Sequence, residues 1–305
     1  MPFMKSPTAE EEEIRGRRSE ISPTRAWWRG LRWLLAFFLV VLLAMTFLET
    51  WLVYPIPPVE SGDWHPAGLD FADVWFASQD GTRLHGWFVE RPQAKRAILY
   101  CHGNGEDVSM NAGVVAQLSD VLDASVFLFD YRGYGHSEGT PTEAGCIADG
   151  LAAQRWLAER IGKQPSDVVV MGRSIGAAIA IAIAAEQGAR ALVLVNAFSR
   201  LTDVAGLHFR WLPVKLVMKN RYDSVARICH YAGPVFQSHG TADWIVPIQL
   251  GRELFAAAPT TQKRFLEIAD RGHNDPEPAN FYRELADFLD DAGRQTTATS
   301  ASSAE

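Results

Sequence analysis

Residues 167–187 read DVVVMGRSIGAAIAIAIAAEQ, and this stretch decides the fold. An apolar run leads into residues 172–176 (GRSIG), which match the pattern G-x-S-x-G, and an alanine-rich segment follows at once. This order predicts a strand, a tight turn and a helix, with glycines that let neighbouring backbone pass the strained turn. Ser174 would then be exposed at a helix N-terminus as a candidate nucleophile. A serine that only capped a buried helix would need neither the flanking glycines nor the preceding strand.

Short apolar runs alternate with helical stretches on both sides of this motif, from about residue 69 to 292. Several runs are apolar at every position, which is typical of parallel strands covered on both faces. We expect strands at 72–77, 84–90, 97–100, 125–129, 167–171, 191–195, 235–238 and 265–268. We expect helices at 111–122, 143–161, 175–187, 249–257 and 277–292. The pattern predicts an α/β fold with a mostly parallel, eight-stranded sheet flanked by helices, and the turn at 78–81 indicates an antiparallel start.

A serine hydroxyl needs a general base, and that base needs an orienting carboxylate. Asp243 follows the expected strand in PVFQSH, and His273 follows the last expected strand. Both lie beyond the carboxyl end of a strand, where such sheets bind their ligands, and after Ser174 in the chain. We therefore predict a triad of Ser174, Asp243 and His273. Residues with a poorer position relative to the strands are His208, His230, His239, Asp203, Asp223 and Asp275.

Acyl transfer also needs hydrogen-bond donors aimed at the developing oxyanion. One expected donor is the backbone N–H of Ile175, directly after the nucleophile. The loop at 101–107 (CHGNGED) follows a strand and contains two glycines that let it fold over the sheet edge. We assign the second donor to the backbone N–H of Asn104. His102 precedes Ser174 and is expected to brace this loop.

Residues 129–139 (FDYRGYGHSEG) permit a rival interpretation, because a G-x-G after an apolar strand can bind a dinucleotide. The third glycine comes one residue too late, and Pro141 separates the loop from the next helix. We therefore expect a loop that supports the rim of the site, and no cofactor. The three cysteines, at 101, 146 and 229, lack metal-site spacing, so no metal is predicted. We expect free thiols, and a disulfide between two of these cysteines is the alternative.

The composition fits one globular domain with an appendage: 305 residues, of which 48% are hydrophobic and 21% charged. The formal net charge is −7, and the basic residues gather only near the N-terminus. Nucleic acid is therefore an unexpected partner.

The N-terminal region predicts a membrane anchor. Residues 1–25 are charged and poor in apolar residues, which indicates a disordered tail. Residues 33–48 carry no charge, and with their flanks at 26–54 they reach the roughly 20 residues that a span needs. Tryptophan and tyrosine lie at both edges, as in aromatic belts. A cleaved signal peptide and a buried core helix are the alternatives, but no clean cleavage site follows the apolar run.

Charge sets the expected orientation of this anchor. Arg25, Arg29 and Arg32 precede the span, and no lysine or arginine follows it until Arg83. The positive-inside rule then leaves the N-terminus in the cytoplasm and the catalytic domain outside, in the periplasm of a bacterium. Residues 55–68 are expected to form a proline-rich stalk and residues 69–292 the domain. The low-complexity residues 293–305 are expected to be a disordered tail.

Residues 199–228 insert an apolar cluster between two strands that need only a short connection. Its apolar members are Leu207, Phe209, Trp211, Leu212, Val214, Leu216 and Val217, interrupted by Arg210, Pro213, Lys215 and Lys219. We expect a small helical cap that covers the site and receives acyl chains from the membrane side. The alternative is a segment that only shields the sheet edge.

The motifs CHGNGED, FDYRGYGHSEGTPTEAG, GRSIGAA, HGTADWIVP and RGHND together resemble the α/β-hydrolase superfamily over about residues 70–290. More narrowly, they resemble its bud-emergence-type branch, which includes small membrane-anchored abhydrolase-domain proteins. The resemblance implies a triad at Ser174, Asp243 and His273 and an oxyanion loop at Asn104. At 196–198 (NAF) the chain departs from the branch, which more often has an acidic residue and a Ser-Pro pair. This departure affects the expected acyl pocket and not the triad.

These observations predict a serine hydrolase that cleaves a carboxylic ester or thioester of a small-molecule or lipidated acyl substrate through an acyl-enzyme on Ser174. A serine peptidase of the same fold and an inactive anchored scaffold are the alternatives. Dehalogenase chemistry is disfavoured because residue 174 is not aspartate. A cofactor-free haloperoxidase would share the same triad, and only an assay separates the two.

Overall fold

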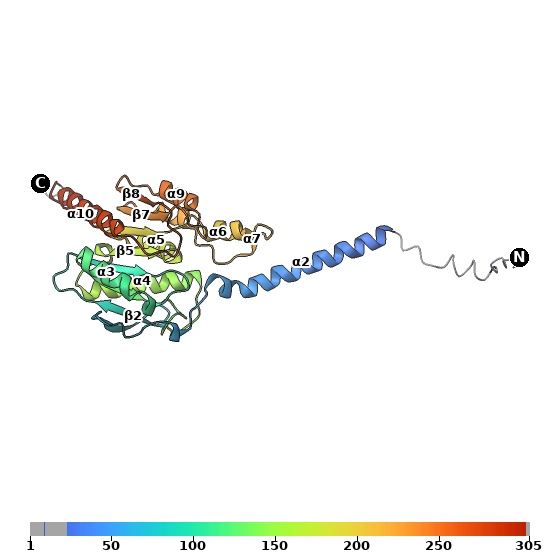
Figure 1. The fold of residues 1–305 in the computed structure, drawn as a ribbon, viewed down its shortest axis with the longest axis horizontal. Coiled ribbons are helices and arrows are strands. Elements are labelled where there is room, and N and C mark those ends of the chain that lie inside the picture. Colours follow the sequence, from blue (N-terminus) through green and yellow to red (C-terminus); the bar gives the residue numbers. More distant parts are fainter. Residues whose placement is uncertain (1–8, 10–22, 303–305) are drawn as a thin grey trace. The chain divides into compact units, whose positions relative to one another are not determined.

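The computed structural model describes residue 9 and residues 23–302. The chain divides into two compact units, Met1–Leu48 and Glu49–Glu305. The first unit holds most of helix α2 (Pro23–Val53), drawn in blue in Figure 1. Within it, Trp27–Met45 has a mean hydropathy of 1.7 and is long and apolar enough to cross a membrane. Signal sequences share these properties. Most of the tail expected at 1–25 lies outside the described residues.

The second unit is built on one eight-stranded sheet with the order β1-β2-β4-β3-β5-β6-β7-β8. Its strands are β1 (Ala72–Ala77), β2 (Arg83–Val89), β3 (Arg96–Cys101), β4 (Ala124–Phe129), β5 (Val169–Arg173), β6 (Ala191–Val195), β7 (Val235–Gly240) and β8 (Lys263–Ile268). Strand β2 pairs antiparallel with both β1 and β4, and the other pairs are parallel. The α/β prediction is confirmed, and the turn at 78–81 closes the expected hairpin.

Helices cover both faces of this sheet, as Figure 1 shows. The main ones are α3 (Ala112–Leu122), α4 (Glu143–Arg160), α5 (Ile175–Gln187), α9 (Ile248–Ala257) and α10 (Ala279–Ser302). Helices α4 and α5 pack into one hydrophobic core, and α3 and α10 pack into a second. Helix α5 is buried along its first ten positions, which explains its run of alanine and isoleucine. This burial holds the start of α5 firmly against the sheet.

The insertion at 199–228 contains the short helices α6 (Leu201–His208), α7 (Val214–Val217) and α8 (Ser224–Ile228). It is partly helical, as expected. Leu212 and Val214 are buried. The exposed apolar side chains are Leu207, Phe209, Trp211 and Leu216.

Two expected boundaries differ from the structure. Residues 55–68, expected as a stalk, belong to the same compact unit as the domain. Within them, Trp64 packs against the second core and stacks on His136 at a ring-centroid distance of 3.8 Å, so burial of this indole ties the segment down. Helix α10 continues to Ser302, so residues 293–302 are helical where we expected a disordered tail.

Candidate active site

Ser174 lies on a strained turn between β5 and α5. Its backbone has φ 53° and ψ −119°, a conformation that a residue with a side chain rarely adopts. A Cβ added at Gly172 would lie 2.2 Å from the carbonyl oxygen of Gly176, and one at Gly176 would lie 2.2 Å from that of Cys101. Both glycines are therefore required by close backbone approach, which accounts for the G-x-S-x-G pattern.

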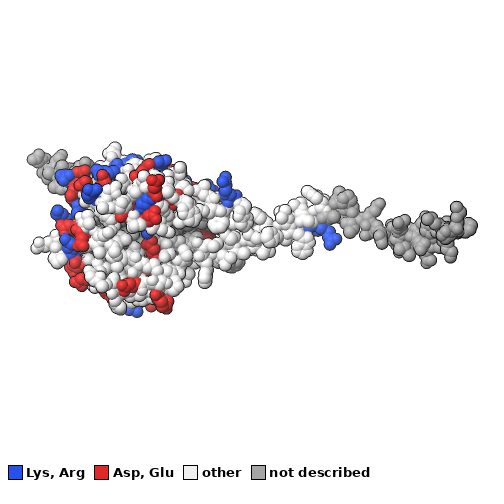
Figure 2. All heavy atoms as spheres, in the orientation of Figure 1, with Lys and Arg blue, Asp and Glu red and all other residues white. Residues whose placement is uncertain are grey.

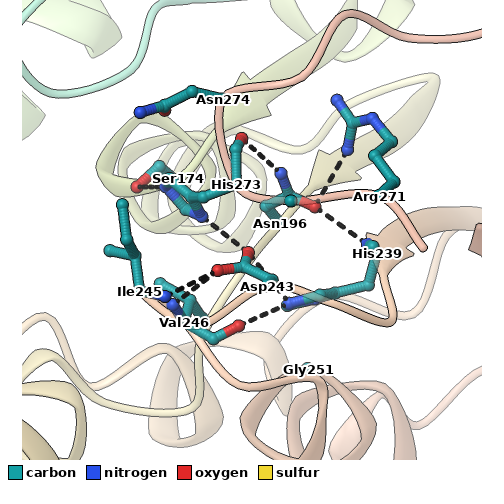
Figure 3. A network of polar contacts seen from close by, with 12 residues as sticks. Ser174, Asn196, His239, Asp243, Ile245, Val246, Gly251, Arg271, His273 and Asn274 are labelled. Carbon is teal, nitrogen blue, oxygen red and sulfur yellow. Dashed lines mark hydrogen bonds and ion pairs between the residues drawn. The ribbon is translucent and has the colours of Figure 1, made fainter.

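The structure brings together the three residues predicted as a triad, although they come from three separate loops. Nε2 of His273 lies 3.0 Å from Oγ of Ser174, and Nδ1 of His273 lies 2.6 Å from Oδ2 of Asp243 (Figure 3). A carboxylate only accepts hydrogen bonds, so Nδ1 carries the proton and Nε2 is free to accept from the serine. This tautomer is the one that a general base needs.

Asp243 is held in place by more than His273. Its Oδ1 accepts the backbone N–H groups of Ile245 at 3.0 Å and Val246 at 2.8 Å. Burial alone raises the pKa of Asp243. The hydrogen bonds with His239 and His273 and from the backbone outweigh burial, so its pKa lies below the ordinary value of 3.8. The carboxylate is therefore ionised throughout the neutral range.

The backbone carbonyl of His273 receives two side-chain donors. Nδ2 of Asn196 and a guanidinium nitrogen of Arg173 each lie 2.8 Å from this oxygen. Arg173 also pairs with Glu106 at 2.7 Å, which joins the histidine loop to the loop after β3. The sequence analysis predicted neither the role of Asn196 nor that of Arg173. Its one indication was that residue 196 departs from the pattern of the branch.

The two predicted oxyanion donors lie at facing backbone segments. Ile175 is the first residue of α5, so its N–H has no partner within the helix. Asn104 lies in the loop after β3, and the start of this loop contacts Gly176 of α5. Both ends of the Asn104 side-chain amide have a partner: its Nδ2 donates to the carbonyl of Val53 at 2.5 Å, and its Oδ1 accepts from Tyr134 at 2.8 Å. The backbone N–H of Asn104 stays the predicted donor to a substrate.

The competing residues have other partners. The ring of His102 hydrogen-bonds the carbonyl of Gly103 at 2.8 Å, which fits the expected bracing of the loop. Asp203 pairs with Lys215, and His208 hydrogen-bonds the carbonyl of Ile245. Asp223 caps α8.

The glycine-rich loop at 129–139 contacts other loops around the site. The hydroxyl of Tyr131 donates to the carbonyl of His102 at 2.9 Å, and that of Tyr134 donates to Oδ1 of Asn104 at 2.8 Å. Arg132 pairs with the buried Asp149 at 2.7 Å. These contacts support the interpretation of this loop as part of the rim.

Among residue 9 and residues 23–302, no three His, Cys, Asp or Glu side chains are grouped closely enough to hold a metal ion. Cys101, Cys146 and Cys229 are free thiols, and burial raises the pKa of Cys146 to about 12. On the face seen in Figure 2, acidic side chains are interspersed with basic ones.

Comparisons with known proteins agree with this fold. A family model described as alpha/beta hydrolase fold matches residues 96–226. Uncharacterized protein Rv2307c of Mycobacterium tuberculosis (strain ATCC 25618 / H37Rv) is 40% identical over 225 residues, which cover 73% of this chain and 78% of that protein. The alpha/beta hydrolase domain-containing protein WAV2 of Arabidopsis thaliana is 30% identical over 241 residues, which cover 73% and 76%.

Solved structures share the same fold. The Pyrococcus furiosus esterase Pf2001 superposes with a TM-score of 0.65 at 20% identity, covering 77% of this chain and 96% of that one. An acetyl xylan esterase from Paenibacillus sp. R4 superposes with a TM-score of 0.60 at 18% identity, covering 75% and 86%. At these identities the likeness concerns the fold alone.

Proposed function

Because the chain belongs to the α/β-hydrolase family, we propose that it is a serine hydrolase that cleaves carboxylic ester or thioester bonds of acyl substrates. The observation that carries the proposal is the hydrogen-bonded chain from Ser174 through His273 to Asp243, with the serine on a strained turn. Esterases among the structures with this fold agree with it.

In the proposed reaction, Oγ of Ser174 attacks the acyl carbonyl while Nε2 of His273 takes its proton. The backbone N–H groups of Ile175 and Asn104 stabilise the oxyanion, and Asp243 stabilises the imidazolium that forms. His273 then gives its proton to the departing alkoxide or thiolate, which leaves an acyl group on Ser174. Water, activated by the same histidine, attacks this acyl-enzyme and releases the acid.

We also assign the chain to the bud-emergence-type branch of the family. Two features support this assignment. One is the motif at 129–145, and the other is the helical insertion at 199–228, which consists of three short helices. The departure at 196–198 has a structural use here, because Asn196 donates to the loop of His273.

The apolar helix is proposed to be an uncleaved anchor, with the N-terminus in the cytoplasm and the catalytic domain on the opposite side. The cap (199–228) then meets the bilayer and admits acyl chains to the site. What supports this role is the exposure of Trp211 and Leu216 on the cap, together with exposed Trp244 directly after Asp243. Apolar surface that remains exposed at a site rim favours binding of long chains or lipid.

The proposal is tested with the full-length protein in detergent micelles. Its hydrolysis of p-nitrophenyl esters, acyl thioesters and aminoacyl amides should be compared with that of Ser174→Ala. We expect ester or thioester turnover by the native chain, and a loss on the order of 10⁴–10⁶ in kcat for the variant. A preference for amides would establish the peptidase alternative. Absence of turnover in every class would favour the inactive scaffold.

A further inference from the structure

The last turn of helix α2 belongs to the second unit, where a buried carboxylate holds it. Glu49 is 7% exposed, whereas Trp51 on the same turn is 82% exposed. The Glu49 carboxylate accepts the backbone N–H groups of Lys219 at 2.8 Å and Asn220 at 2.7 Å, and also Nδ2 of Asn220 at 2.9 Å. Burying a carboxylate is costly without such donors, so this contact is specific.

Tyr54, just after the helix, continues the same contact. Its hydroxyl donates to Oδ1 of Asn220 at 2.9 Å and lies 2.9 Å from the hydroxyl of Tyr222. Its ring, like the side chain of Val53, lies in the hydrophobic core that also contains α4 and α5. The segment Glu49–Tyr54 is therefore packed into the domain and is more than a flexible connection.

This segment also reaches the oxyanion loop. The carbonyl of Val53 accepts Nδ2 of Asn104 at 2.5 Å, and Tyr134 donates to the other end of the same amide. Pro55 lies next to Gly105, at ordinary contact distance from a Cβ placed there. The amide of Asn104 is thus fixed at both ends, and its fixed side chain restricts the rotation of the peptide that carries its N–H.

We propose that the end of the apolar helix is a structural part of the oxyanion site, with Glu49 and the carbonyl of Val53 as positioning groups for the backbone N–H of Asn104. Glu49 fixes the helix end on Lys219 and Asn220, and the Val53 carbonyl then holds Asn104. This inference rests on the proposed hydrolase function. It ties activity to the last turn of α2, which follows the apolar stretch Trp27–Met45, so this turn would be required for turnover.

The test uses the full-length protein in detergent micelles and a short ester, p-nitrophenyl acetate. One oxyanion donor is worth about 10²–10³ in kcat, so a displaced donor in Glu49→Ala should cost about 10–100-fold in kcat. The KM should change less than about twofold, because ground-state binding is untouched. Trp51→Ala is the matched control on the same turn, and its kcat should equal that of the native chain.

Two further measurements separate positioning from loss of structure. Affinity for a trifluoromethyl ketone, which forms an oxyanion adduct on serine, should fall in Glu49→Ala by the same factor as kcat/KM. The double variant Glu49→Ala/Asn104→Ala should be no slower than Asn104→Ala alone, because both changes act on one donor. If Glu49→Ala fails to fold, the isosteric variant Glu49→Gln tests the proposal instead. We expect a smaller loss of kcat in this variant, with a parallel fall in its affinity for the ketone.

Independent, multiplicative losses in the double variant would overturn the proposal. So would native kcat and native ketone affinity in Glu49→Gln and Glu49→Ala. Failure of the proposed function looks different: the native chain itself would then neither hydrolyse the ester nor bind the ketone.

Discussion

Nδ2 of Asn196 donates a hydrogen bond of 2.8 Å to the backbone carbonyl of His273, which ties the loop of the proposed general base to the end of strand β6. Asn196 is fully buried and has a positive φ of 49°, a conformation that asparagine tolerates better than most residues. Its Oδ1 accepts the N–H of Gly240 at 3.2 Å, at the end of β7. One amide therefore links the loops that carry His273 and Asp243.

Replacing Asn196 by alanine should loosen this link. The change leaves buried backbone groups without their partner, which should lower the free energy of unfolding by about 1–3 kcal/mol. We expect kcat to fall about 10-fold or more while KM changes little, because the histidine is misplaced and substrate binding is not. Steady-state kinetics and thermal unfolding measure both effects. Asn274→Ala is the control, because Asn274 makes only a weak contact with Arg173 at 3.4 Å; an equal kcat loss there would contradict the account.

The cap should set chain-length preference. Replacing Phe209 and Trp211, which are exposed apolar residues of the cap, by serine removes apolar surface that long chains would contact. Each buried CH₂ is worth about 0.8 kcal/mol, so kcat/KM for long-chain esters should fall about 10-fold or more. Hydrolysis of p-nitrophenyl acetate should stay at the native rate. A uniform response of short and long esters would assign the cap a shielding role only.

The stability of the fold should depend on pH through His85. Both of its ring nitrogens face carboxylates: Nε2 lies 2.9 Å from Asp73 and Nδ1 lies 3.2 Å from Asp130. Burial lowers the pKa of His85, but these two contacts outweigh it and leave the pKa above 6.5. The unfolded chain then loses this proton at lower pH than the folded one does.

This stabilisation is fully present below pH 6.5, the ordinary value for histidine, and is lost as the pH rises through the higher folded pKa. Melting temperatures of the native chain should therefore decline as the pH rises above 6.5, and His85→Gln should flatten that decline. Equal pH dependence in both proteins would show that another group is responsible.

The fold and the triad candidates could be predicted because their signals are local. Strand β6 (ALVLV) is apolar at every position, β5 begins with the apolar run VVM and β7 with VF, and each candidate follows a strand or its turn. Chain order then selected Ser174, Asp243 and His273. The glycines around Ser174 needed no knowledge of distant residues, since a tight turn before a buried helix requires them wherever it occurs.

The supporting contacts could not be predicted, because they join residues far apart in the sequence. Glu49 reaches Asn220, and from sequence it only marked the edge of a span. Arg173 donates to the carbonyl of His273, although the residues next to Arg173 in the sequence give no indication of that partner. We expected a stalk at 55–68, whereas this segment packs on the domain. The packing of Trp64 on His136 joins residues far apart in the sequence, so the sequence pattern does not indicate it.

The central claim is that Ser174 is a nucleophile activated by His273. The most direct measurement is labelling of the full-length protein with a fluorophosphonate, followed by mass spectrometry of its peptides. We expect one phosphonyl group, located on Ser174, with no labelling of Ser174→Ala and strongly slowed labelling of His273→Ala. Labelling that persists in Ser174→Ala, or a native protein that does not react, would contradict it.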